Sequence, residues 1–208
     1  MRSLFLDTST SKSVVSIIED NNVLAFIDFQ NNKLLSENIF ILIDKCFKQA
    51  NINPNEIDKI FVVTGPGSFT GVRIGVTIAK TYAWTLNKEV ISISSLECMA
   101  STCNCNSIVS LIDARRGYVF AGVYDSNLNT IIKDQYVKLD SLKEMIDSNS
   151  VFVSLDEFDF ATIKPNYDIV KIINKHQFDT SVKPHTLVPN YLKLTEAEEK
   201  RIKSDRTS

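Results

Sequence analysis

Glycine is scarce in this sequence, and so are the side chains that most often bind metal ions. The 208 residues include 6 glycines, 4 cysteines, 2 histidines and 1 tryptophan. His176 and His185 lack the helical spacing of a paired zinc ligand set, and the cysteines lack paired CxxC spacing (Cys46, Cys98, Cys103 and Cys105). These shortages argue against a metal centre. They favour reduced thiols and two histidines that lie on the surface.

Long apolar runs and a basic excess are missing too. No run approaches the roughly 20 apolar residues that span a bilayer, and the apolar start of the chain ends at Asp7, too early for a secretory signal. Lys and Arg number 23 against 25 Asp and Glu, which gives a net charge of −2. We therefore expect a cytoplasmic protein that makes no membrane contact and would need a partner to hold nucleic acid.

What the sequence does contain is one pattern of strands and helices, βββαβα, that occurs twice. Apolar strands ending in Asp7 and Asp113 each precede a turn, a second strand, another turn and a third strand. Two unrelated hairpins are the alternative to a duplication. Two such lobes describe an α/β fold of the actin-like (ASKHA, ribonuclease H-like) type. We predict lobes at residues 1–100 and 101–192, followed by a charged tail at 193–208.

Four of the six glycines lie in TGPGSFTGVRIGVTIAK, residues 64–80, between a predicted strand and a helix that ends near Leu86. The start of a helix suits an anion, but this stretch matches neither the P-loop nor GxGxxG. Small residues then recur every four positions (Gly71, Gly75, Ala79 and Ala83), and such a row lets another helix approach closely. The row predicts a groove for a partner helix. Packing against the protein's own sheet is the alternative.

Two apolar side chains are predicted on helix faces that should contact water. At 100° per residue, Trp84 projects onto the side of Arg73 and Lys80. Ile41 lies among charged residues of the preceding helix, for which Ser36 is the expected N-cap. Two such residues on neighbouring helices favour a second buried face and hence a protein partner.

Catalytic candidates are few. The first turn, Asp7-Thr8-Ser9-Thr10, lacks the glycine of the phosphate-binding DxGT turn, and no glycine follows Gly122. No nucleophile-elbow sequence is present. We expect no catalytic residue and no metal ligand, with vestigial nucleotide-facing turns at Asp7, Thr8, Ser9 and Asp113. The alternative for the two aspartates is that they cap backbone N–H groups.

Four segments together resemble the bacterial TsaB (YeaZ) family over essentially the whole chain: FLDTST at 5–10, TGPGSFTGVRIGVTIAK at 64–80, LIDARRGYVFAGVY at 111–124 and VPNYLKLTEAE at 188–198. The resemblance implies an actin-like scaffold without catalytic activity of its own. It implies a role in making threonylcarbamoyladenosine beside the anticodon of tRNAs that read codons starting with A. The implied partners are TsaD, bound directly helix to helix, and the ATPase TsaE, with tRNA bound only through the complex.

By the same resemblance, TsaD would contact the helices at residues 36–50 and 71–86. The predicted interface residues are Ile39, Phe40, Ile41, Ile43, Phe47, Gly71, Arg73, Ile74, Gly75, Ile78, Ala79, Tyr82 and Trp84. We expect no cofactor on this chain alone, ATP or ADP at the complex interface as an open alternative, and a homodimer through the same helices when TsaD is absent. Leu35 stands where many relatives have a histidine, which further weakens a metal role. A glycoprotease-type metallopeptidase and an actin-like small-molecule kinase are the alternative functions.

Overall fold

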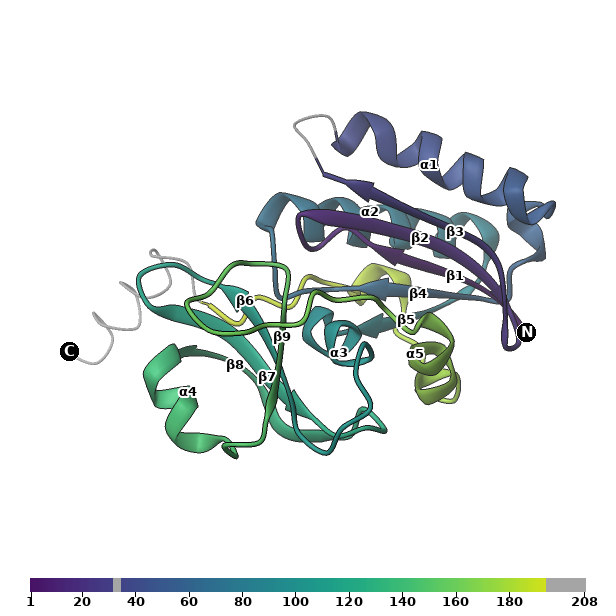
Figure 1. The fold of residues 1–208 in the computed structure, drawn as a ribbon. Helices are drawn as coiled ribbons and strands as arrows, with labels where there is room; N and C mark the ends of the chain where they lie inside the picture. Colours follow the sequence, from purple (N-terminus) through teal and green to yellow (C-terminus); the bar gives the residue numbers. More distant parts are fainter. Residues whose placement is uncertain (32–34, 194–208) are drawn as a thin grey trace.

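The fold consists of two β-sheets, each covered by helices, in a computed structural model that describes residues 1–31 and 35–193 (Figure 1). The first sheet has five strands in the order β3-β2-β1-β4-β5 and the second has four in the order β8-β7-β6-β9. The strands of the first sheet are β1 (Arg2–Asp7), β2 (Lys12–Glu19), β3 (Asn22–Gln30), β4 (Lys59–Val63) and β5 (Glu89–Ile93). Those of the second sheet are β6 (Ile108–Asp113), β7 (Tyr118–Tyr124), β8 (Thr130–Lys138) and β9 (Val151–Ser154).

The two sheets repeat one topology, which confirms the predicted duplication. In the first, β1 pairs antiparallel with β2 and parallel with β4. In the second, β6 pairs antiparallel with β7 and parallel with β9. The helices follow the same order of elements: α1 (Leu35–Ala50), α2 (Phe69–Leu86) and α3 (Ser95–Ala100) in the first half, then α4 (Leu139–Met145) and α5 (Ile169–His176). The α/β, actin-like fold class is thus confirmed.

Both faces of the central strands β1, β2 and β4 are buried, which explains their nearly unbroken apolar sequences, whereas the edge strand β3 exposes one face. Side chains alternate across a strand, so Leu4 and Leu6 of β1 pack under α1 and α2, whereas Phe5 points to the opposite face. There it meets α3 and α5 through residues such as Leu96 and Ile172. At about 25 cal/mol for each Å² of apolar surface removed from water, these two layers supply most of the stabilisation of the first lobe.

The end of the chain returns to the first sheet. The amide N–H of Val182 donates to the carbonyl of Val90 on β5 at 2.8 Å, and that of Asn190 donates to Thr64 at 2.7 Å. The segment predicted as the second lobe, 101–192, therefore divides: its strands build the second sheet, α5 packs in a core that both sheets share, and residues 182–190 return to the first sheet. The predicted tail at 193–208 lies outside the described residues apart from Lys193. Helix α1 begins at Leu35, so Ser36 lies in its first turn rather than at the N-cap.

The row of small residues on α2 packs against the protein itself, which corrects the predicted groove for a partner helix. Gly71, Gly75, Ala79 and Ala83 are all buried. A Cβ atom added to Gly71 would overlap the carbonyl oxygen of Thr8, and one added to Gly75 would overlap the Thr8 hydroxyl. The glycines thus let the β1–β2 turn approach α2, and the Thr8 hydroxyl donates to the Gly71 carbonyl at 2.7 Å. Helical periodicity identified the small face without showing what covers it.

Candidate partner surface and interlobe cleft

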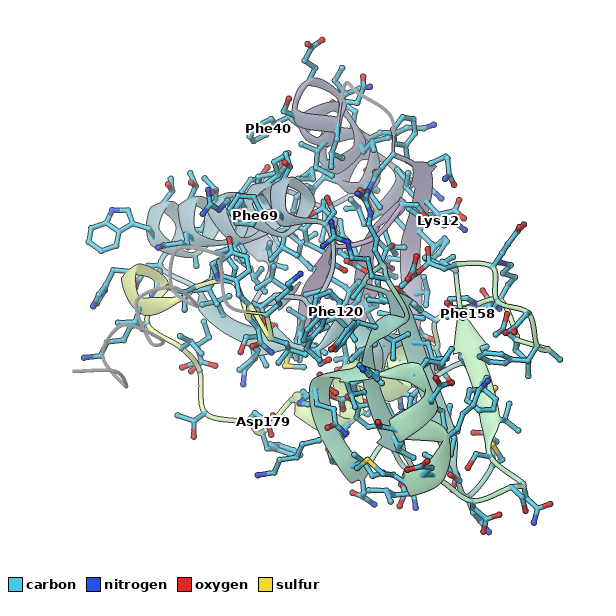
Figure 2. The ribbon with its side chains drawn as sticks, turned by 90° about the vertical axis from the view of Figure 1, so that its left-hand side faces the viewer. Lys12, Phe40, Phe69, Phe120, Phe158 and Asp179 are labelled. Carbon is cyan, nitrogen blue, oxygen red and sulfur yellow. The ribbon has the colours of Figure 1, made fainter. Side chains whose placement is uncertain are left out.

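The outer faces of α1 and α2 carry the exposed apolar side chains that the sequence indicated. Trp84 is 73% exposed and Ile41 is 64% exposed. Phe40 on α1 and Phe69 at the start of α2 are also about half exposed (Figure 2). We call the exposed faces of these two helices the helical surface, defined by Phe40, Ile41, Phe69, Arg73 and Trp84.

Seven of the predicted interface residues do not belong to the helical surface. Ile39, Ile43, Phe47, Gly71, Gly75, Ile78 and Ala79 are buried against the protein's own strands. A partner cannot reach these side chains in the folded chain, so their assignment to the interface is corrected. Ile74 and Tyr82 are partly buried, and Phe40, Ile41, Arg73 and Trp84 remain exposed. The correction follows from amphipathicity, because the apolar stripe of each helix faces the sheet.

An apolar groove runs between the two helices on the helical surface. Its volume is about 410 Å³ and it is lined by Ser36, Phe40, Phe69, Thr70, Arg73, Ile74, Thr77 and Ile78. The Arg73 guanidinium lies 3.8 Å from the centre of the Phe69 ring, and its Nε donates to the Tyr191 hydroxyl at 2.7 Å. Arg73, one of the predicted interface residues, is thus held by two aromatic side chains.

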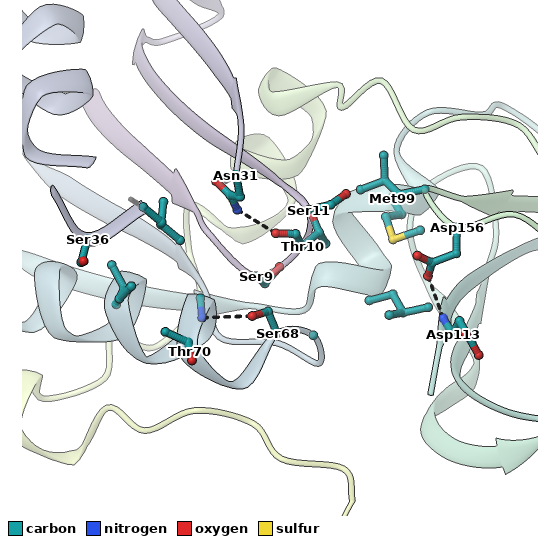
Figure 3. A pocket seen from close by; sticks show the side chains of 16 residues that line it. Ser9, Thr10, Ser11, Asn31, Ser36, Ser68, Thr70, Met99, Asp113 and Asp156 are labelled. Carbon is teal, nitrogen blue, oxygen red and sulfur yellow. Dashed lines mark hydrogen bonds between the residues drawn. The ribbon is translucent and has the colours of Figure 1, made fainter. Parts of the chain in front are cut away.

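A second concavity, of about 470 Å³, lies between the two lobes (Figure 3). One wall is formed by hydroxyl side chains of the β1–β2 turn and the start of α2, including Thr10, Ser68 and Thr70. Met99, Asp113 and Asp156 lie on the opposite wall. The cleft therefore places hydroxyl groups opposite carboxylates, with apolar side chains between them (Leu35, Ile74, Met99, Ile112 and Leu155).

Asp7, the acid placed where an actin-like protein would hold its ligand, does not line this cleft. Its side chain is fully buried, and one carboxylate oxygen accepts hydrogen bonds from the Ser9 amide at 2.7 Å and the Ser9 hydroxyl at 2.6 Å. The Tyr167 hydroxyl donates to the other oxygen at 3.0 Å. Burial raises the pKa of Asp7, although these hydrogen bonds oppose the shift.

Asp113 makes the matching contact in the second lobe. Its carboxylate accepts from the Arg115 amide at 2.8 Å, two residues on, as that of Asp7 does from Ser9. Both aspartates therefore cap backbone N–H groups of a turn, which was the alternative weighed from the sequence. Of the predicted nucleotide-facing residues, Ser9 and Asp113 line the cleft and Asp7 and Thr8 do not; only Asp113 is exposed, since Asp7, Thr8 and Ser9 are all buried.

One buried ionic cluster was missed from the sequence. Glu97 on α3 accepts hydrogen bonds from Lys175 at 2.6 Å and shares one with the Nε2 atom of His176 at 2.8 Å. The Nδ1 atom of His176 lies 2.6 Å from Asp179. His176 is therefore not the surface histidine that the sequence suggested. The only signal was an acid, Glu97, in the otherwise apolar segment SLECMA.

The cluster changes the pKa values of its members. Burial lowers the pKa of His176, but hydrogen bonds and charges from Glu97 and Asp179 outweigh burial and raise it above the ordinary value of 6.5. For Glu97, burial acts to raise the pKa, but the hydrogen bonds and charges of His176 and Lys175 outweigh burial, so that the pKa of Glu97 is lowered overall. The pair is thus most stable with both groups charged.

Metal-ligating side chains do not gather in the described part of the chain: across residues 1–31 and 35–193, no three His, Cys, Asp or Glu side chains are grouped to hold an ion. All four cysteines are free thiols. No described helix is both long enough and apolar enough to cross a membrane.

Comparison with known proteins identifies the family. Residues 30–200 match the family model described as TsaD, tRNA N6-adenosine threonylcarbamoyltransferase. The tRNA threonylcarbamoyladenosine biosynthesis protein TsaB of Bacillus subtilis (strain 168) is 31% identical over 231 aligned positions, which cover 99% of this chain and 100% of the Bacillus protein. The chain belongs to the TsaB family, and to the wider family of the TsaD model.

Solved structures with the same fold agree with membership of the TsaB family. A Pseudomonas aeruginosa protein described as similar to the peptidase YeaZ matches with a TM-score of 0.78 at 19% identity, over 92% of this chain and 99% of that one. YeaZ from Pseudomonas aeruginosa matches with a TM-score of 0.75 at 20% identity, over the same shares of the two chains. At these identities the match establishes the fold alone.

Proposed function

We propose that this chain is a non-catalytic subunit that binds TsaD through the helical surface. It thereby supports threonylcarbamoyl transfer to N6 of the adenosine beside the anticodon of tRNAs that read A-starting codons. The observation that carries the proposal is the helical surface itself, where the only tryptophan is 73% exposed on α2. Family membership supplies the pathway, because the Bacillus subtilis relative is named for threonylcarbamoyladenosine biosynthesis.

The state of Asp7 supports a non-catalytic role. Both carboxylate oxygens are held by side chains and backbone of the same chain. A ligand or metal that needed this carboxylate would have to break those contacts inside a fully buried site. We propose that the chain binds no cofactor alone, and that any ATP or ADP binds where TsaD completes the site.

The remaining partners follow from the family. We propose that TsaE joins the complex of this chain with TsaD, and that the chain pairs with itself through the helical surface when TsaD is absent. An apolar patch of this kind tends to be covered in solution. No observation favours the peptidase or kinase alternatives.

Replacement of Trp84 tests the helical surface directly. Trp84→Ala should raise the dissociation constant for TsaD about 10-fold or more, because large aromatic side chains dominate the energetics of interfaces. Phe178→Ala is the matched control, since Phe178 is 90% exposed and lies beyond α5, on the other side of the first sheet. Both titrations are read by calorimetry with purified TsaD.

The control decides how the result is read. The fold should be unchanged in both variants, since each removed side chain contacts mainly water. Equal TsaD affinity in Trp84→Ala, Phe178→Ala and the unaltered chain would place the interface elsewhere. Substantial ATP hydrolysis or tRNA modification by the isolated chain would contradict the non-catalytic role.

A further inference from the structure

A second surface, apart from the outer faces of α1 and α2, combines stacked aromatic rings with lysine and arginine. On β7 and β8, the rings of Tyr118 and Tyr136 stack with centroids 4.8 Å apart and an interplanar angle of 11°. The Lys138 ammonium lies 5.9 Å from the Tyr118 ring, and the Lys193 ammonium lies 5.2 Å from the Tyr136 ring. Each of the two tyrosine rings thus has one exposed lysine close to it. We call this the tyrosine surface.

The tyrosine surface continues toward α2 through the end of the described chain. Tyr191 lies two residues before Lys193, and its ring stacks on Phe69 with centroids 5.3 Å apart. Rings and cations therefore alternate along one line, from β8 across residues 191–193 to the start of α2. Figure 2 shows Phe69 on α2 and Phe120 on β7. The centroids of the Phe120 and Tyr136 rings lie 5.6 Å apart.

The cations of the tyrosine surface form no ion pairs within the described residues. Arg115 and Arg116 occupy the exposed turn just before Tyr118. Among the ion pairs of residues 1–31 and 35–193, none involves Arg73, Arg115, Arg116, Lys138 or Lys193. Two exposed acids lie two residues from these cations: Asp113, which accepts a hydrogen bond from the Arg115 backbone, and Asp140, which follows Lys138. Neither forms an ion pair with them. A chain with a net charge of −2 thus gathers five unpaired cations around stacked rings.

We propose that the tyrosine surface binds an unpaired segment of RNA, with bases stacked on the tyrosine rings and phosphates held by the lysines and arginines. Stacked aromatic side chains interleaved with cations are how proteins hold single-stranded nucleic acid, because every base has a flat face and every linkage a negative charge. The lysines that lie over the rings are exposed, so they can move to a phosphate when a base takes their place. The inference rests on the proposed function, under which the bound RNA would be a tRNA.

The surface is separate from the one proposed for TsaD, so the two can be tested independently. Arg73 borders both and is left unaltered. Tyr136→Ala removes one stacking ring, and Tyr136→Phe is its control because it keeps the ring. Lys138→Gln removes one cation, and Lys133→Gln is its control: Lys133 is exposed on the same strand, five residues or about 16 Å away.

The experiment titrates the complex of each variant with TsaD against an unmodified, transcribed tRNA that reads an A-starting codon, at several salt concentrations. Tyr136→Ala should weaken tRNA binding by about 5- to 100-fold, and Tyr136→Phe by less than about 2-fold. Lys138→Gln should lower the slope of log affinity against log salt by about 1, whereas Lys133→Gln leaves it unchanged. Thermal unfolding of each variant checks that the sheet is intact.

Normal TsaD binding with unchanged tRNA affinity in both Tyr136→Ala and Lys138→Gln would overturn the RNA inference and leave the proposed function standing. Loss of TsaD binding in these variants would also overturn it, since the tyrosine surface would then be a protein interface. Should the unaltered chain fail to bind TsaD, the proposed function fails. The same titrations on the chain alone would then decide the RNA inference by the same criteria.

Discussion

At the scale of single residues, the contacts of Thr8 explain why glycines gather on α2. The Thr8 hydroxyl donates to Gly71 and lies where a Cβ atom of residue 75 would be. The turn that carries Thr8 therefore rests directly on the helix backbone. This close approach fixes the β1–β2 turn at the wall of the interlobe cleft.

Gly75→Ala tests this packing. Alanine is the better helix former by about 1 kcal/mol, yet the added methyl group would overlap the Thr8 hydroxyl. We expect a net loss of about 1–3 kcal/mol in the free energy of unfolding, since overpacking a tight core is destabilising. Denaturant unfolding measures it. In a Thr8→Ala background, Gly75→Ala should lower the free energy of unfolding much less. An equal loss in both backgrounds would contradict the contact between residue 75 and the Thr8 hydroxyl.

Residue contacts of this kind could not be predicted from the sequence. Thr8 and Gly71 lie 63 positions apart, and Glu97 and His176 lie 79 apart. Periodicity showed which side of α2 carries small residues, and it placed Trp84 and Ile41 on the exposed sides, as the structure confirms. It gave no information about the turn that covers the small residues, because that turn belongs to a distant part of the chain.

At the scale of elements, the ionic cluster joins α3 to α5. Glu97 lies on α3, Lys175 and His176 end α5, and Lys175 also donates to the carbonyl of Leu128. Close by, Asp134 of β8 accepts from the Ser94 hydroxyl at the start of α3. Burial raises the pKa of Asp134, and hydrogen bonds from Ser94 and Tyr124 oppose the shift. Polar contacts therefore tie α3 both to the last helix and to the second sheet.

The cluster predicts how stability depends on pH. The pKa of His176 is raised in the folded chain above the ordinary 6.5, so the folded state binds the proton more tightly than the unfolded state. This contribution is fully present below pH 6.5 and is lost as the pH rises through the raised pKa of His176. Glu97 acts in the opposite direction: its lowered pKa makes a contribution that is lost in acid, below its ordinary 4.5.

His176→Gln should therefore lower the free energy of unfolding at pH 6 by about 2 kcal/mol, with a smaller loss at pH 9. Urea titrations across this range measure the difference between variant and unaltered chain. His185→Gln is the control, because His185 is exposed. A difference for His176→Gln that stayed constant from pH 6 to pH 9 would show that the imidazole is not protonated in the cluster.

The helices and strands themselves followed closely from local pattern. Runs such as SVVSIIED and VLAFIDF are strands because β-branched and aromatic residues suit a packed sheet, and the Ser68 hydroxyl caps α2 by accepting from the Gly71 amide at 3.2 Å. The division of the second half did not follow from local pattern, because α5 packs its apolar stripe (Ile169, Ile172 and Ile173) in a core that both sheets share, and the chain after it returns to the first sheet. Such long-range packing is not visible in any local pattern.

At the scale of the whole molecule, the two lobes present three surfaces with different chemistry. The helical surface is apolar and exposed, the interlobe cleft combines hydroxyl and carboxylate groups with apolar side chains, and the tyrosine surface is aromatic and basic. The chain's own atoms occupy Asp7 at the end of β1, where an actin-like enzyme would act. We propose that the helical surface binds TsaD, that the tyrosine surface binds RNA, and that catalysis belongs to TsaD.

The most direct test of TsaD docking uses the single tryptophan as a reporter. The chain is labelled with 5-fluorotryptophan, so that fluorine NMR shows one resonance, from Trp84. At a dilution at which the chain is monomeric, adding unlabelled TsaD should move this resonance and remove most of its sensitivity to exchange of H2O for D2O, because the indole ring passes from water into the interface. A resonance that keeps its position and its solvent sensitivity at saturating TsaD would contradict the account.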